Sequence, residues 1–184
     1  MDDQSQAYEE IIGPIEDRML RSIWRITRDP HDAEDAMQNA LVTLWNRWNR
    51  VRRHASPHAL VLKICVDAAL DVARRRGRDR RNIESNDPAG HPAEGLRLPL
   101  EELANSELRR EVLAAIGGLS RHQAVTVMLR AFEELPYNQI AAALGCTEAT
   151  ARKHFERACA RLRLALARHQ PNVSIGGSHD RSRR

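Results

Sequence analysis

Aromatic residues and β-branched runs are scarce in this chain of 184 residues. Phe, Trp and Tyr together make up 4% of it, and runs of Val, Ile and Thr are rare. β-Sandwiches and barrels usually draw on those residues, so an all-β fold is excluded. Ala, Leu, Arg and Glu dominate instead, and these residues favour helix. The expected fold class is all-α.

Long apolar runs and clustered cysteines are missing as well. No stretch of about 18 uncharged apolar residues could span a membrane, and the N-terminal stretch with Asp2, Asp3, Glu9 and Glu10 is acidic where a secretory signal is basic. The three cysteines, Cys65, Cys146 and Cys159, lie far apart and form no Cys-x-x-Cys pair. This spacing argues against a disulfide framework or a zinc site. We expect a cytoplasmic protein without metal or other cofactor.

The positive charge comes almost entirely from arginine and is concentrated in two stretches. The formal net charge is +4. Six arginines oppose one aspartate between Arg74 and Arg81, and six basic residues oppose two glutamates between Glu148 and Arg168. Arginine suits phosphate and guanine edges better than lysine does. Two separated basic stripes favour an extended polyanion as partner, although a solvated helix face would carry the same charges.

Proline and glycine divide the chain into two helical halves. The segment from Arg78 to Pro99 holds five of them among polar residues and is typical of a flexible linker. We therefore expect a first domain at 1–77, a linker at 78–104, a second domain at 105–168 and a disordered basic tail at 169–184.

The first domain has the pattern of a three-to-four-helix bundle. Apolar residues recur at three- and four-residue steps from Ile11 to Ile26. The pairs Asp29-Pro30 and Ser56-Pro57 each combine a capping residue with a proline suited to the first helical position, so each predicts a helix start.

The second domain contains the pattern of a helix-turn-helix. Ser120 and Gln123 have the spacing of a capping box at the start of its second helix. A short helix from Pro136, a turn at Gly145 and a longer basic helix capped by Thr147 follow. Helical spacing places Ala151, Phe155 and Ala158 inward. The opposite face presents polar groups suited to base edges and phosphates: Glu148, Arg152, Lys153, Glu156 and Arg157.

Two stretches resemble the bacterial sigma-70 family, in its extracytoplasmic-function (ECF) subgroup. The run from Asp29 to Trp45, DPHDAEDAMQNALVTLW, resembles region 2 of the family. The sequence from Leu119 to Arg163 is similar to region 4, with YNQIA at 137–141, Leu144-Gly145, Thr150 and Arg157-Ala158 in order. The resemblance covers about 10–77 and 105–168, with a linker where the family has one.

The resemblance implies a dissociable initiation subunit of RNA polymerase. Region 2 would bind the β′ clamp helices and open the −10 element, and region 4 would read the −35 element and contact the β flap. An anti-sigma partner is common in the subgroup, although nothing in this sequence identifies one. The polymerase contact falls on Asp35, Gln38, Asn39 and Leu41. The −35 contact falls on Thr150, Arg152, Lys153, Glu156 and Arg157.

The −10 side departs from the family pattern. Leu60 and Asp67 stand where the subgroup commonly carries Trp and Asn. A carboxylate repels DNA phosphate where an amide both donates and accepts. Either a different −10 sequence is read, or Asp67 turns inward and the loop from Arg50 to Ser56 holds the flipped-out base. The candidate −10 residues are Arg50, Arg53, His54, Asp67, Arg74 and Arg75.

Three other functions deserve comparison. An enzyme is disfavoured, because the eight histidines are scattered and no phosphate loop or catalytic pairing is present. A promoter-binding regulator that acts without polymerase would share the second domain but has no use for Ala33 to Trp45. A sigma-like adaptor that cannot melt DNA remains open because of Leu60 and Asp67.

Overall fold

The chain is helical in every element that the computed structural model describes, which covers residues 3–84 and 100–167. We call residues 3–84 the front half and 100–167 the back half. The front half contains α1 (Asp3–Ile12), the 3-10 turn η1 (Gly13–Ile15), α2 (Glu16–Thr27), α3 (Pro30–Asn46), α4 (Trp48–Val51) and α5 (Pro57–Glu84). The back half contains α6 (Leu100–Gly117), α7 (Arg121–Val127), the π-helical turn η2 (Met128–Phe132), α8 (Tyr137–Leu144) and α9 (Glu148–Ala165). The all-α prediction is confirmed.

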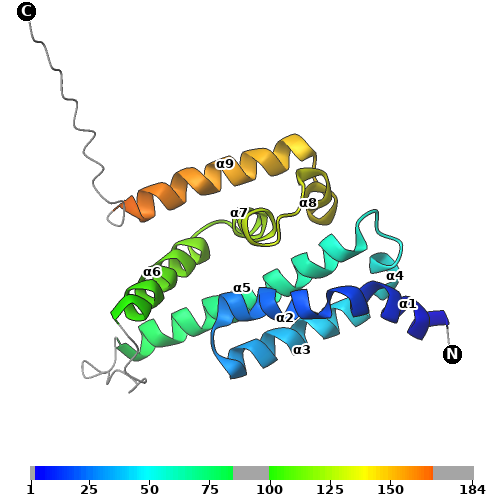
Figure 1. The fold of residues 1–184 in the computed structure, drawn as a ribbon, viewed down its shortest axis with the longest axis horizontal. Coiled ribbons are helices and arrows are strands. Elements are labelled where there is room, and N and C mark those ends of the chain that lie inside the picture. Colours follow the sequence, from blue (N-terminus) through cyan, green and yellow to red (C-terminus); the bar gives the residue numbers. More distant parts are fainter. Residues whose placement is uncertain (1–2, 85–99, 168–184) are drawn as a thin grey trace, which may run out of the picture.

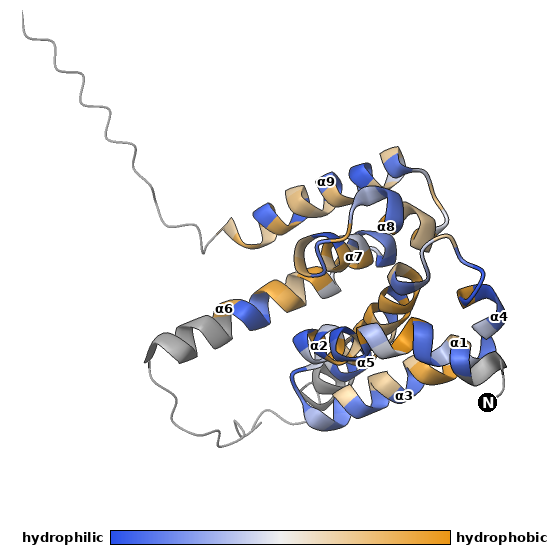
Figure 2. Cartoon of the chain, turned by 45° about the vertical axis from the view of Figure 1, so that its right-hand side comes forward, coloured by the Kyte–Doolittle hydropathy of each residue, from blue (hydrophilic) through white to orange (hydrophobic). Residues whose placement is uncertain are grey.

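Helix α5 is the centre of the molecule. It packs against α2 and α3 in the front half and against α7, η2 and α8 in the back half. Its middle is apolar on almost every side, which Figure 2 shows as a largely hydrophobic stretch. Val61, Leu62 and Val66 are fully buried there. A helix that is hydrophobic all round has to be covered on all sides, and the two halves together provide that cover.

The starts of α3 and α9 follow the predicted capping residues. Asp29 Oδ1 accepts hydrogen bonds from the backbone N–H groups of His31 at 3.0 Å and Asp32 at 3.1 Å, directly before Pro30. The amide of Asp32 and then the side chain of Arg76 lower the pKa of Asp29, which keeps the cap ionised. Thr147 caps α9 in the same way, by accepting a hydrogen bond from the backbone N–H group of Thr150. Each cap satisfies backbone N–H groups that have no partner within the first turn of a helix.

Two local details of the structure go beyond or differ from the sequence patterns. The apolar stripe from Ile11 to Ile26 belongs to two helices, because Pro14 lacks an N–H group and the chain forms η1 between α1 and α2. Ser120 does precede α7, but its side chain makes no capping hydrogen bond. The Oε1 atom of Gln123 is buried without a hydrogen-bond partner, so the predicted capping box does not form.

The linker is shorter than predicted at both ends. Helix α5 continues to Glu84, because residues 78–84 contain neither proline nor glycine and their arginines and Glu84 favour a helix. Helix α6 begins at Leu100, directly after Pro99. Residues 85–99 and the predicted tail at 169–184 lie outside the described residues.

The two halves share one hydrophobic core. The buried cluster runs from Ile23, Leu62 and Val66 in the front half to Leu129 and Ile140 in the back half without interruption. The two helical regions are therefore packed against each other in this structure. This packing has a physical reason: α5 keeps an apolar face after α2 and α3 have packed, and α7, η2 and α8 cover it.

The buried stripe of α2 generates a stability prediction. The side chain of Ile23 is 1% exposed, whereas Leu20, one turn away on the same helix, is 51% exposed. We expect Ile23→Ala to lower the free energy of unfolding by about 2–5 kcal/mol, because it leaves a cavity between α2 and α5. Leu20→Ala is the matched control, with an expected change of less than about 1 kcal/mol. Urea unfolding followed by circular dichroism measures both, and equal losses would contradict this packing.

Candidate functional site

Helices α8 and α9 form a helix-turn-helix with a tight turn. Gly145 ends α8 at φ +68°, a left-handed conformation that a side chain disfavours, and its N–H group donates to Ala142 O at 3.2 Å. Cys146 N–H donates to Ala141 O at 3.0 Å. Thr147 then caps α9 by accepting a hydrogen bond from Thr150 N–H at 3.2 Å. The chain therefore reverses within three residues and presents the N-terminus of α9 to solvent.

Small and aromatic side chains hold α9 against the rest of the back half. Ala151 and Ala158 are fully buried, as the periodicity predicts. Tyr137 at the start of α8 meets Phe155 edge-to-face, with ring centroids 6.1 Å apart. This packing fixes which face of α9 points outward.

The outward face of α9 carries the predicted −35 residues. Lys153, Glu156 and Arg157 are exposed, and none of the three donates or accepts a side-chain hydrogen bond among the described residues. Arg152 is exposed but already held: its Nη2 lies 2.7 Å from Glu148 Oε1, and its Cζ lies 4.6 Å from the centroid of the Tyr137 ring. Within residues 3–84 and 100–167, Arg157 is thus an unpaired cation, while Arg152 is oriented in advance.

Two neighbouring groups complete this surface. The side chain of Thr150 is half-buried, and its hydroxyl lies 2.8 Å from that of Thr147, so it acts in the cap. His154 stacks on His122 of α7, with ring centroids 5.5 Å apart. Burial, then the charges of His122 and Arg157, lowers the pKa of His154, so its ring is neutral near pH 7. The cationic character of this face rests on arginine and lysine.

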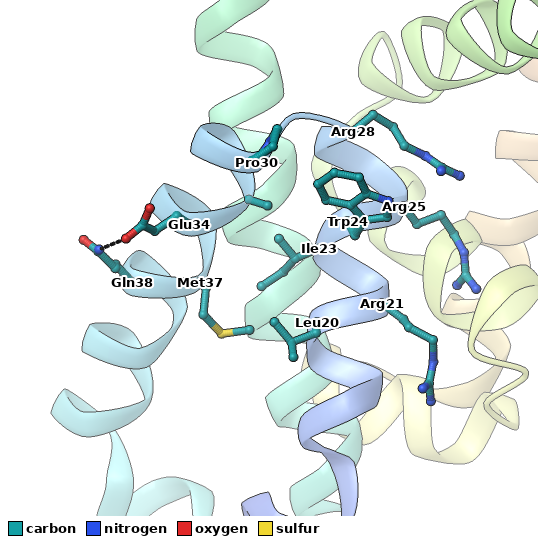
Figure 3. A pocket seen from close by; sticks show the side chains of 11 residues that line it. Leu20, Arg21, Ile23, Trp24, Arg25, Arg28, Pro30, Glu34, Met37 and Gln38 are labelled. Carbon is teal, nitrogen blue, oxygen red and sulfur yellow. Dashed lines mark hydrogen bonds between the residues drawn. The ribbon is translucent and has the colours of Figure 1, made fainter. Parts of the chain in front are cut away.

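A second candidate site is an apolar groove between α2 and α3. Its volume is about 810 Å³. Leu20, Ile23 and Met37 face one another across it, as Figure 3 shows, and Trp24 lies at its edge with 44% of its surface exposed. Arg21, Arg25 and Arg28 project from α2 on the side away from α3. Exposed apolar surface rimmed by polar residues marks a protein-binding site.

The predicted polymerase residues fall around this groove unequally. Gln38 lines it, and its Nε2 donates to Glu34 Oε1 at 3.4 Å (Figure 3). Asp35 and Asn39 are exposed on α3 but do not line the groove. Leu41 belongs to a separate apolar hollow of about 450 Å³ beside Trp45, whose surface is 70% exposed. The sequence patterns did not identify Leu20 and Trp24, because each stands one position after a residue of the buried stripe and single exposed apolar residues are common on protein surfaces.

The structure does not gather the predicted −10 residues on one open surface. Arg53 and Arg75 are exposed. Arg50 borders a cavity of about 100 Å³ shared with Ala143 and Leu144 of α8. Sites for small molecules usually measure about 300–1,000 Å³, so this cavity has no room for a flipped-out base.

Two further −10 candidates are bonded to the back half. His54 Nε2 lies 3.1 Å from Ala142 O, and its Nδ1 lies 3.0 Å from Ser56 O. Arg74 donates to Gly117 O at 3.3 Å and to Leu119 O at 3.1 Å. Both side chains therefore stabilise the junction of the halves in this arrangement.

Asp67 is turned inward and is not available to DNA here. Its side chain is 9% exposed, with Oδ1 2.7 Å from Arg121 Nε and Oδ2 2.7 Å from Lys63 Nζ. A buried carboxylate needs such cations, since burial without them costs several kcal/mol. The bond to Asp67 correspondingly raises the pKa of Arg121. Of the two alternatives left open by the sequence, the inward orientation is the one found.

Metal and membrane chemistry find no support in the described residues. No group of three or more His, Cys, Asp or Glu side chains within 3–84 and 100–167 is arranged to hold a metal ion. Among the helices described, none combines the length and the apolar character needed to cross a bilayer. Burial raises the pKa of the Cys65 thiol to about 12, so this cysteine is inert.

The turn before α9 generates the prediction for this site. Gly145→Ala forces an alanine to φ +68° and should cost about 1–2 kcal/mol in free energy of unfolding, although the space around it is open. Gly77→Ala is the control, because it also adds a methyl group in open space but within helix α5 at negative φ. It should stabilise by about 0.5–1 kcal/mol. Thermal or urea unfolding distinguishes them, and a stabilising Gly145→Ala would refute the turn geometry.

Comparison with known proteins agrees with this architecture. The family model described as Sigma-70 region 2 matches residues 14–79, and that described as Sigma-70, region 4 matches residues 109–162. An RNA polymerase sigma-E factor of Streptomyces avermitilis is 29% identical over 159 residues, covering 86% of this chain and 84% of the relative. The ECF RNA polymerase sigma factor SigE of Mycolicibacterium smegmatis is 29% identical over 168 residues, covering 91% of this chain and 65% of the relative.

A solved structure shares the fold. The sigma factor RpoE of Bartonella quintana, solved in complex with the anti-sigma factor NepR, superposes with a TM-score of 0.52 at 21% identity, covering 87% of this chain and 96% of that one. Two matched regions in the family's order and the named relatives lead to one conclusion. The chain belongs to the sigma-70 family of RNA polymerase sigma factors, in the ECF subgroup.

Proposed function

We propose that this chain is an initiation subunit that binds core RNA polymerase and directs it to promoters through −10 and −35 elements. The observation that carries the proposal is the coexistence of two surfaces in one chain: the basic outward face of α9 and the apolar groove between α2 and α3. A regulator that only binds DNA would need the first surface and not the second. The protein acts as a non-enzymatic factor on chromosomal promoters, and hence at the nucleoid of a bacterial cytoplasm.

Helix α9 is the reading element for the −35 sequence. Its first ten residues carry three exposed cations, Arg152, Lys153 and Arg157. The N-terminal part of a recognition helix contacts base edges in the major groove. Arg157 suits a bidentate contact with guanine, and Lys153 suits a phosphate. Arg152, held by Glu148 and Tyr137, is positioned in advance and loses little conformational freedom on binding.

The groove between α2 and α3 is the docking site for an amphipathic helix of the polymerase clamp. Its accessible apolar side chains, Leu20, Trp24 and Met37, would contact a stripe of side chains spaced at three and four residues. The arginines on α2 favour acidic side chains at one edge of that helix, and Gln38 offers hydrogen bonds at the other. Asp35, Asn39 and Leu41 extend the contact along α3. The β flap and an anti-sigma factor are further proposed partners.

A factor that binds polymerase but cannot melt DNA is the second candidate. Asp67 and Leu60 are buried, so neither offers a group to an unstacked base in this arrangement. Run-off transcription with purified core polymerase on a library of promoters tests both candidates. Specific transcripts support the initiation factor. Binding to polymerase without any transcript supports the adaptor, and absence of polymerase binding refutes both.

Arg157→Ala should weaken −35 recognition in a sequence-dependent way. Loss of one bidentate contact costs about 1–3 kcal/mol on the preferred sequence and removes discrimination at one base pair. Affinity for scrambled DNA should change only slightly. Fluorescence anisotropy on matched and single-substituted duplexes measures this at fixed salt, because phosphate contacts depend on ionic strength. An equal loss on every duplex would assign Arg157 to the phosphate backbone instead.

Leu20→Ala and Gln38→Ala should both weaken binding to core polymerase. Leu20→Ala removes apolar contact area from the groove, and Gln38→Ala removes hydrogen-bonding groups at its edge. Each substitution should reduce the binding free energy by about 1–2 kcal/mol. Trp45→Ala probes the separate hollow on α3 that also contains Leu41, and Leu164→Ala, on α9, is the control for truncation of an exposed apolar side chain. Titration of labelled core polymerase measures the affinities. If Trp45→Ala alone reduces affinity, the docking site is the other hollow.

A further inference from the structure

A cavity lies where the C-terminal part of α5 meets α6 and the turn between α2 and α3 (Figure 1). Its volume is about 760 Å³, and small-molecule sites usually measure about 300–1,000 Å³. Its lining comes from three segments that are distant in the sequence, within 26–32, 70–78 and 110–118. Among the described residues, it shares only Arg28 with the groove between α2 and α3. It is therefore a separate site of suitable size for a small molecule.

Arginine dominates the charged lining of this cavity. The charged residues are Arg28, Arg74, Arg76, Arg78 and Arg110, together with Asp29 and Asp32. Both aspartates are already paired, because Arg76 Nη1 lies 3.1 Å from Asp29 Oδ2 and also bonds Asp32 Oδ2. The other four arginines have no carboxylate partner in the described part of the chain. The cavity thus carries an excess of positive charge.

Three of these four arginines keep all their side-chain donors available. Arg28, Arg78 and Arg110 are exposed, and none of their guanidinium groups forms a hydrogen bond or an ion pair within residues 3–84 and 100–167. Arg74 differs, since it donates to two backbone carbonyls of the back half. A guanidinium presents five N–H donors in a planar fork, and phosphate oxygens accept from two of them at once. The free arginines are therefore suited to phosphate groups.

The backbone places Arg28 at this cavity in an unusual conformation. Helix α2 ends at Arg28 with φ +55°, a left-handed conformation that glycine usually supplies at the end of a helix. In Figure 3 the side chain points away from α3. Burial, then the charges of Arg109 and Arg25, lowers the pKa of Arg28. The guanidinium is thus partly withdrawn from water among like charges, and an anion in the cavity would relieve that repulsion.

An apolar wall completes the cavity. We call Ile26, Leu70 and Leu113 the apolar wall: the first two are buried, and Leu113 is half-buried. A lone inorganic phosphate would leave this wall uncovered and most of the volume empty. Duplex DNA presents its phosphates on a convex rod, which does not enter a hollow. A small molecule that combines several phosphates with an uncharged ring system matches both the arginines and the wall.

We propose that this cavity binds a small organic molecule with two or more phosphate groups, of the class of nucleoside di- and triphosphates. The phosphates contact Arg28, Arg78 and Arg110, and the nucleoside lies against the apolar wall. Arg76 remains with its two aspartates and shields the phosphates from them. No covalent bond is made or broken. Binding of this kind is a property of the free chain and does not depend on the proposed function.

Isothermal titration calorimetry of the full chain at fixed salt tests the ligand class, since exposed charges are screened by salt. ATP should bind saturably with one site per chain. AMP should bind about tenfold more weakly or worse, because it offers fewer charged acceptors, and adenosine should not bind detectably. GTP should bind within about threefold of ATP, because the described lining holds no aromatic, Asn or Gln side chain that would distinguish the bases.

Inorganic tripolyphosphate distinguishes a nucleotide site from a site for phosphate alone. It carries the charges of ATP without the nucleoside, so it should bind about threefold or more weakly than ATP. Leu113→Ala trims the apolar wall and should reduce this difference by weakening only the binding of ATP. Circular dichroism verifies that Leu113→Ala keeps the helix content of the wild type.

Adjacent arginines on α6 provide a matched pair of variants. Arg110→Ala removes a lining guanidinium and should weaken ATP binding about fivefold or more, as loss of a charged hydrogen bond does. Arg109→Ala is the control, because Arg109 is equally exposed but does not line the cavity. It should change the affinity by less than about twofold, because screening weakens its longer-range attraction. Arg78→Ala tests the α5 side and should behave like Arg110→Ala.

Four results would overturn the proposal. The first is the absence of saturable ATP binding. The second is an equal loss for Arg109→Ala and Arg110→Ala, which would indicate diffuse attraction to a basic surface. The third is tripolyphosphate binding as tightly as ATP, which would leave a site for phosphate alone. The fourth is complete displacement of ATP by a short duplex of scrambled sequence, which would assign these arginines to the DNA backbone. Because the titrations contain no polymerase, failure of the proposed function would leave their outcome unchanged.

Discussion

A carboxylate withdrawn from water must be surrounded by cations or hydrogen-bond donors, and two such carboxylates decide how the halves of this protein meet. Glu133 reaches α2, where two arginines and a serine surround it. Asp67 reaches the back half through Arg121. The apolar layer between α5 and α8 supplies attraction without direction. The charged contacts supply direction, because a shift or rotation of one half would leave a buried charge without its partner.

The two working surfaces use different physics, and the fold keeps them apart. The face of α9 exposes arginine and lysine, whose long-range field and hydrogen-bonding groups suit a polyanion. The groove between α2 and α3 exposes leucine and tryptophan, which suit a partner helix and would gain nothing from phosphate. Because α5 lies between these surfaces, neither interferes with the other. A chain with both surfaces can bring a large partner to one DNA sequence.

Local features of this fold could be predicted from sequence, and features made by distant residues could not. The cap at Asp29, the turn at Gly145 and the inward stripe of α9 depend on residues within one or two turns, and the structure contains all three. The outward face of α9 follows from the same period. Arg18 and Glu133 are 115 residues apart, and no pattern in either segment refers to the other. Ser120 shows that local patterns can also mislead. It has the spacing of a capping box before α7, but its side chain makes no capping hydrogen bond.

Asp67 shows why a departure from a family pattern can be physically consistent. An amide at this position would suit a nucleobase, since it both donates and accepts. A carboxylate only accepts, and in this structure two cationic side chains, Lys63 and Arg121, pair with it. An amide would leave both cations less well compensated in a part-buried site, and its NH₂ group would face another donor. The substitution that weakens the −10 resemblance is thus the one that the junction between the halves requires. While Asp67 pairs with Lys63 and Arg121, its carboxylate cannot contact a DNA base.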